Sequence, residues 1–275
     1  GLLGSLGHSN QHIRNTARRL LQEILFEELL STPQADGKDG GKTRRILSAL
    51  AGMIRDDSLS ATIHQGALSV LISAAALATS PELSELDAYL ARHGNPEFRR
   101  AAIRMRSARA DVSVGQSADA DAPSASQQVL FDQLFEFARD ESRDVLLQTA
   151  IATSSLHSTQ ARAELLLTVQ SKAGDDELIP RIVWRRLEAV LAEQGSEAVI
   201  KALESHRASG FANLDRLLPR ITERALAHPR TTPEQIGQLF SMFAIGTHPK
   251  LEVARQCLNF LAERIRNREL AGESL

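Results

Sequence analysis

The chain has 275 residues, of which 43% are hydrophobic and 24% are charged, and its formal net charge is −2. This composition excludes global disorder, and the near-neutral charge excludes a strong overall field that would draw the molecule onto nucleic acid or an anionic membrane. Cys257 is the single cysteine, which excludes an intrachain disulfide, a Cys-x-x-Cys metal site and a haem-attachment motif.

Helical signals begin close to the first residue. Asn10 is a suitable cap for a helix over 10–28, whose apolar residues recur at helical spacing. Leu2, Leu3 and Leu6 before it resemble part of a helix that docks on this one. A loop with one proline and three glycines follows at 33–42. Further helices are predicted at 43–55, 61–78, 82–92 and 96–109.

The composition changes between residues 110 and 126, where Ala, Asp, Ser, Gln and Gly predominate. We interpret this stretch as a low-complexity connector between N-terminal repeats at 1–109 and C-terminal repeats at 127–275. Period-two alternation is missing, so no strands are predicted, and no apolar run approaches the roughly 20 residues that cross a bilayer. Helices are predicted at 127–139, 142–154, 158–172, 178–192, 196–208, 211–227, 233–244 and 250–268.

A short phrase recurs at 13–17, 63–67 and 98–102, with a bulky apolar residue, a basic residue, two variable positions and an alanine. Such a phrase is typical of stacked helical pairs. We therefore predict an all-α fold, an α-α superhelix, that is, a HEAT/armadillo-like solenoid of antiparallel helical hairpins. The apolar residue and the alanine are expected to pack inside, which leaves the basic residue for an external role. The uneven spacing of the phrases suggests insertions in loops on one face, where partners often bind.

The arginine-rich segment 98–109 is the strongest candidate for a partner surface. Its arginines have no acid among them, and guanidinium groups can grip phosphates. No aromatic residues are interleaved to stack on bases, so a solvated helix face is the favoured interpretation. Within this segment, Arg99, Arg100 and Arg104 are predicted as partner-binding residues.

The other candidate sites in the sequence are better explained by structural roles than by metal binding, phosphate binding or catalysis. His8 and His12 have the spacing of two metal ligands on one helix face, but no third ligand lies nearby in the sequence. Residues 40–43 resemble the end of a phosphate-binding loop without its upstream strand and first glycine. Cys257 and Trp184 fall in apolar helical patterns and are expected to be buried. No catalytic, cofactor-binding or metal-binding residue is identified, and we predict no cofactor and no enzymatic activity.

Three stretches resemble a known family: 7–21 (Gly-His-Ser-Asn-Gln-His-Ile-Arg-Asn-Thr-Ala-Arg-Arg-Leu-Leu), 94–102 (Gly-Asn-Pro-Glu-Phe-Arg-Arg-Ala-Ala) and 176–184 (Asp-Glu-Leu-Ile-Pro-Arg-Ile-Val-Trp). They are similar to the HEAT-like segment of large multidomain proteins from planctomycetes and related bacteria. In that family such arrays tend to follow a β-propeller resembling sugar or sorbosone dehydrogenases and to precede a c-type cytochrome module. The resemblance implies an exported, periplasmic parent protein of dehydrogenase type, but it transfers no catalytic or haem residue, because neither of those modules is present here.

These observations favour a non-catalytic scaffold or protein-interaction module, cut from a larger exported protein. Its expected partners are other proteins or flanking domains of the same polypeptide, while nucleic acid is disfavoured and the oligomeric state is left open. The alternative is a DNA-binding or DNA-repair protein that acts through an Arg-rich concave face. That alternative requires basic side chains from several repeats to converge around a central acid or aromatic residue.

Overall fold

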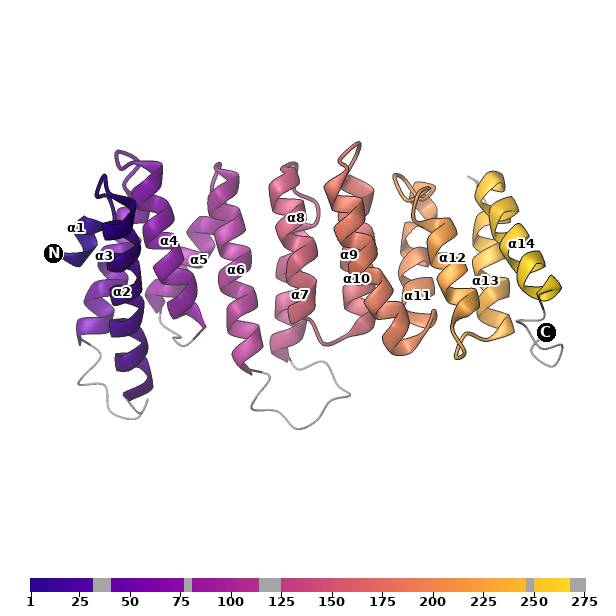
Figure 1. Cartoon of the computed structure of the whole chain (residues 1–275), viewed down its shortest axis with the longest axis horizontal. Helices are drawn as coiled ribbons and strands as arrows, with labels where there is room; N and C mark the ends of the chain where they lie inside the picture. Colours follow the sequence, from indigo (N-terminus) through magenta and orange to yellow (C-terminus); the bar gives the residue numbers. More distant parts are fainter. Residues whose placement is uncertain (32–40, 77–80, 114–124, 246–249, 268–275) are drawn as a thin grey trace. The chain divides into compact units, whose positions relative to one another are not determined.

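The computed structural model describes residues 1–31, 41–76, 81–113, 125–245 and 250–267. These residues form fourteen α-helices and two short 3-10 helices, and no strand occurs among them, so the predicted all-α class is confirmed for this part of the chain. The chain divides into two compact units, Gly1–Ala122 and Pro123–Leu275. Figure 1 labels the helices of each. None of the described helices is long and apolar enough to cross a membrane.

The first unit contains six helices, which pack in chain order. Contacts join α1 to α2, α2 to α3, α3 to α4 and α5 to α6, and in addition α2 contacts α4, α4 contacts α6 and α3 contacts α5. The short first helix docks on the second, as the leucines near the start of the chain predict. Helices α2, α4 and α6 therefore lie side by side in a row (Figure 1). Their bounds are α1 (Leu2–Ser5), α2 (Gln11–Ser31), α3 (Gly41–Arg55), α4 (Ala61–Ala75), α5 (Pro81–Ala91) and α6 (Pro96–Ser113).

The alanine of the recurring phrase lies where neighbouring helices of this row meet. Ala17, Ala67 and Ala102 are at most 2% exposed, one in each of α2, α4 and α6. A methyl side chain lets adjacent helices approach closely while still excluding water. The bulky apolar position is less uniform, because Phe98 is 3% exposed and Ile13 is 38% exposed. The predicted packing role is therefore confirmed for the alanines.

Asparagine side chains begin two helices of the row. The Asn10 side-chain oxygen accepts a hydrogen bond from the backbone N–H of His12 at 2.8 Å, which confirms the predicted cap. Asn95 accepts in the same way from the backbone N–H of Glu97 at 2.9 Å. Each bond satisfies a backbone donor that has no partner within its helix, so it defines where the helix starts.

The second unit has eight α-helices in a regular alternation. Each helix contacts the next but one, so α7, α9, α11 and α13 form one row and α8, α10, α12 and α14 form another, and contacts between consecutive helices join the two rows from α7 to α11 and from α12 to α14. Apolar residues of both rows make the core between them. The bounds are α7 (Ala125–Phe137), α8 (Arg143–Ala152), α9 (Thr159–Lys172), α10 (Leu178–Gln194), α11 (Glu197–His206), α12 (Leu218–Ala227), α13 (Pro233–Ala244) and α14 (Leu251–Arg266).

The helix predicted at 211–227 is wrong over its first seven residues, because α12 begins at Leu218. Phe211 and Asn213 have φ angles of 56° and 57°, a left-handed conformation that ends the regular helix. Phe211 and Leu214 are nevertheless buried, at 1% and 0% exposure. A buried turn therefore produces the same apolar spacing as a helix, which explains the error.

Most other predicted helix boundaries differ from the structure by one to four residues, and two of them bear on the expected connector. The helix predicted at 96–109 continues to Ser113, and the one predicted from 127 begins at Ala125, so both edges of the expected connector at 110–126 are helical. The rest of that connector, 114–124, lies outside the described residues. The predicted loop at 33–42 also lies outside them except for its last two residues, which open α3.

Candidate partner-binding surface

The basic residue of the recurring phrase secures the turn before its own helix. Arg14 donates through Nη1 to the carbonyl oxygens of His8 and Ser9, at 2.7 and 2.8 Å. Arg99 donates through Nη1 to two carbonyl oxygens of the turn before α6, at 2.8 and 2.9 Å. In the middle phrase, Nε2 of His64 lies 3.1 Å from a carbonyl oxygen of the turn before α4. This residue thus has a structural role that the sequence did not predict.

The three predicted partner-binding residues lie on α6 and differ in their surroundings. Arg99 is half-buried and bound to its turn, as described above. Arg100 donates through Nη1 to Oε1 of Glu97 at 2.6 Å, and its side chain is 24% exposed. Arg104 is exposed, and it lies on the same helix face as Arg100 because the two residues are four positions apart. The structure therefore brings Arg100 and Arg104 together and turns Arg99 to another face.

A polar cleft of about 190 Å³ lies between α2 and α4 of the same row. It contains two arginines, Arg14 and Arg18, which follow each other at helical spacing on α2. No acidic residue lines it. The lining residues are Leu6, Gln11, Arg14, Asn15, Arg18, Thr62, Gln65 and Gly66.

The two arginines of the cleft keep hydrogen-bond donors for a ligand. Arg14 uses its two Nη1 hydrogens for the turn, which leaves the three at Nε and Nη2 without an acceptor among the described residues. Arg18 donates through Nη2 to the side-chain oxygen of Asn15. With the amides of Gln11 and Gln65 beside them, these groups form a donor-rich pocket that suits a carboxylate or another anion.

The residues that line the cleft show no arrangement typical of a catalytic site. Its residues include no nucleophile paired with a base, and no group of three or more His, Cys, Asp or Glu in the described part of the chain could hold a metal ion. His8, considered above for a metal, accepts a hydrogen bond through Nδ1 from the backbone N–H of Asn10 at 3.0 Å. Sequence reasoning missed the cleft because Arg14 and Arg18 become part of a pocket only when α4 packs beside α2.

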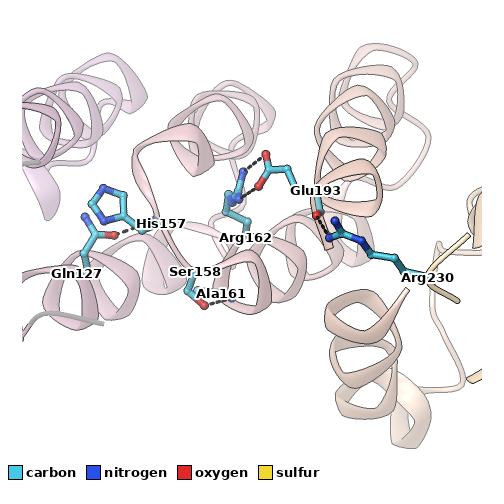
Figure 2. A network of polar contacts seen from close by, with 7 residues as sticks. All are labelled: Gln127, His157, Ser158, Ala161, Arg162, Glu193 and Arg230. Atoms are coloured by element: carbon cyan, nitrogen blue, oxygen red, sulfur yellow. Dashed lines mark hydrogen bonds and ion pairs between the residues drawn. The ribbon is translucent and has the colours of Figure 1, made fainter. Parts of the chain in front are cut away.

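In the second unit, an ion pair and a hydrogen bond join three parts of the fold (Figure 2). Arg162 on α9 donates through Nη1 to Oε1 of Glu193 at 3.1 Å and through Nη2 to Oε2, and its side chain is 16% exposed. Arg230, in the turn before α13, donates to the backbone carbonyl of Glu193 at 3.3 Å. Glu193 lies near the end of α10, so these contacts fasten α9, α10 and the turn before α13 together.

Gln127 makes the neighbouring contacts in Figure 2 and is 6% exposed. Its side-chain oxygen accepts from the backbone N–H of His157 at 3.0 Å, and its amide donates to the carbonyl of Ser155 at 3.3 Å. Ser158 then caps α9 by accepting from the backbone N–H of Ala161 at 3.2 Å. These side chains form hydrogen bonds or ion pairs with other parts of the chain, so we interpret the network as a structural one that holds helices and turns together.

Cys257 and Trp184 were both expected to be buried, and the structure buries only the cysteine fully. Cys257 is fully buried, and burial raises the pKa of its thiol, which favours the unreactive protonated form. Trp184 is half-buried instead of filling the core, and the Arg220 guanidinium lies 4.3 Å from the centre of its ring. A cation–π contact between α10 and α12 thus replaces the expected core packing of the tryptophan.

Comparison with known proteins finds no family model, no curated protein and no solved structure that matches this chain. Inference about its function therefore rests on its own geometry. The features that bear on it are the rows of helices in each unit and the donor-rich cleft of the first unit.

Proposed function

We propose that the chain is a HEAT/armadillo-like α-solenoid that serves as a non-catalytic scaffold and binds an acidic segment of a partner protein. The helix contacts within each unit support the solenoid, because most helices pack on the next helix or the next but one. Such an array leaves the outer faces of its rows free to carry polar side chains for binding.

The cleft between α2 and α4 is the observation that carries the choice of partner. Arg14 and Arg18 present N–H groups there with no acid nearby, and planar guanidinium groups pair with carboxylates through two parallel hydrogen bonds. Arg100 and Arg104 extend the basic character of the same row to α6.

A second part of the proposal concerns the protein in which this module works. The resemblance of residues 7–21 to HEAT-like segments of planctomycete multidomain proteins supports a module that holds flanking catalytic domains in an exported, periplasmic polypeptide. The coding sequence on either side of this chain tests that part. A β-propeller upstream and a Cys-x-x-Cys-His motif downstream are expected, and unrelated flanking domains would overturn it.

Peptide binding to the full chain tests the cleft. A fluorescein-labelled peptide of about ten residues, mostly Glu, should raise the fluorescence anisotropy on binding, and its Gln counterpart should not. We expect Arg18→Gln to weaken binding by roughly 3- to 10-fold, because one charged hydrogen-bonding partner is lost. Arg19→Gln is the matched control, since Arg19 is the next residue, is 69% exposed and pairs with Glu23 outside the cleft.

Two outcomes would overturn this binding site. One is equal binding of the Glu and Gln peptides, and the other is an Arg18→Gln variant that binds like the parent chain. A short duplex DNA labelled in the same way provides the comparison with the alternative function. Tighter binding of the duplex, falling steeply as salt is raised, would favour the DNA-binding interpretation instead.

A further inference from the structure

Helix α14, labelled in the second unit in Figure 1, carries a row of exposed apolar side chains. Leu251, Leu258 and Ile265 are 65%, 54% and 46% exposed, and they are spaced seven residues apart. At 100° per residue these three positions fall within about 40° of one another around the helix axis. They therefore form a single stripe along the whole helix, which we call the α14 stripe.

The stripe is unlike the usual solvent side of a helix. Such a side usually carries polar and charged residues, whereas a continuous row of large apolar side chains is typical of an interaction surface. The buried residues Val253, Ala254 and Cys257 lie 140°, 40° and 100° from Leu258 around the helix axis, and α14 packs on α12 and α13. The α14 stripe therefore runs beside the buried face of the helix as additional apolar surface that is exposed.

The spacing of the stripe indicates what kind of structure would cover it. Apolar residues at strict seven-residue intervals match a second α-helix crossing at about 20°, because this repeat follows the seam between two helices. Packing of one helix on another already occurs in this unit, where each helix of the row from α8 to α14 packs on the next one in the row. A helix on the α14 stripe would continue that mode of packing.

The charges beside the stripe indicate the composition of that helix. By helical geometry, Arg255 and Arg266 are the nearest charged residues on its solvent side, 60° and 80° from Leu258. Arg255 is 72% exposed and pairs with Glu252 at 2.9 Å, and Arg266 is exposed near the end of the helix. Acidic side chains on an incoming helix would lie opposite these two arginines.

We propose that the α14 stripe docks an amphipathic α-helix of a partner protein, with leucine or isoleucine at heptad spacing and glutamate or aspartate along its flank. This surface is separate from the cleft of the first unit, so it is a second docking site and does not depend on the function proposed above. Apolar contact supplies the binding at this site, and the flanking arginines select the charge of the partner.

Two designed peptides of about 20 residues test the proposal with the full chain. Both carry Leu at heptad positions, and one has Glu while the other has Lys on the flank. In fluorescence anisotropy we expect the Glu peptide to bind at least about tenfold tighter than the Lys peptide. Leu258→Gln should weaken its binding about tenfold or more, and Arg255→Glu combined with Arg266→Glu should reverse the preference.

Glu263→Gln is the matched control, because Glu263 is exposed on α14 but lies 140° from Leu258 around the helix. It should leave Glu-peptide binding unchanged, and circular dichroism should show that all variants retain their helix content. Unchanged binding in Leu258→Gln, or equal binding of a scrambled Glu peptide, would overturn the proposal. So would a dimer of the parent chain that Leu258→Gln dissociates in sedimentation, since the stripe would then be an interface between two copies.

Discussion

Arg106 on α6 donates through Nε to both carboxylate oxygens of Asp87 on α5, at 3.1 and 3.0 Å, and the two side chains are only 10% and 11% exposed. A second guanidinium lies nearby on the same helix. Burial lowers the pKa of Arg109, and the charge of Asp87 opposes that effect while the charge of Arg106 adds to it. Asp87 therefore balances charge for two largely buried arginines of the first unit.

Removing this carboxylate should destabilise the first unit strongly. We expect Asp87→Asn to lower the free energy of unfolding by about 3–5 kcal/mol, because it leaves Arg106 buried without its counter-charge. Urea unfolding followed by circular dichroism measures the loss. Glu197→Gln is the control, since both side chains of its pair with Lys201 are about 60% exposed and the solvent-screened pair should contribute little to stability. Equal losses in the two variants would contradict the prediction.

The turn contacts of the recurring phrase lead to a second prediction. Arg99→Met keeps the aliphatic part of the side chain but removes two hydrogen bonds to the turn before α6. We expect a loss of about 1–2 kcal/mol in the free energy of unfolding and faster hydrogen exchange of the amides in that turn. Arg92→Met, at an exposed arginine near the same turn, is the control. Unaltered exchange in Arg99→Met would show that these bonds do not hold the turn.

Local signals in the sequence predicted the parts of the fold that depend on neighbours along the chain. Apolar periodicity located the helices, Asn10 marked the start of α2, and the alanines of the phrase marked the packed positions. Periodicity could not distinguish the buried turn at 211–217 from a helix, because buried side chains have similar spacing in both.

The candidate site required information that no local pattern contains. The cleft depends on Arg18 of α2 lying beside Gln65 of α4, and these residues are far apart in the sequence. The pair of Arg162 with Glu193 likewise spans 31 residues. The phrase marked Arg14 and Arg99 as notable, but their hydrogen bonds to the preceding turns emerge only from the folded backbone.

Asn213 provides a test of the left-handed turn before α12. Its φ is 57°, and its side-chain amide donates to the carbonyl of Ser171 at 2.7 Å. Asn213→Ala and Asn213→Gly both lose that bond, but the alanine must also adopt a conformation that strains a residue with a Cβ atom. The larger entropy of glycine in the unfolded chain offsets part of this strain. We therefore expect the free energy of unfolding of Asn213→Ala in urea to be lower than that of Asn213→Gly by up to about 1 kcal/mol. A more stable Ala variant would contradict this.

His206, at the end of α11, predicts how stability depends on pH. Its Nε2 atom is buried without a hydrogen-bond partner in the described part of the chain, and burial lowers the pKa of its imidazole below the usual value for histidine. As the pH falls through about 6.5, the unfolded chain therefore takes up a proton that the folded chain does not, and the free energy of unfolding decreases. The stabilisation is complete above that pH and is lost progressively below it.

Thermal unfolding at about pH 7.5 and about pH 5.5 measures the effect of this histidine. His206→Gln should reduce the fall in melting temperature between the two conditions, because the glutamine side chain does not titrate. His12→Gln, at an exposed position on α2, is the control and should preserve the fall seen in the parent chain. If His206→Gln showed the same fall as the parent chain, the acid sensitivity would have to arise from other groups.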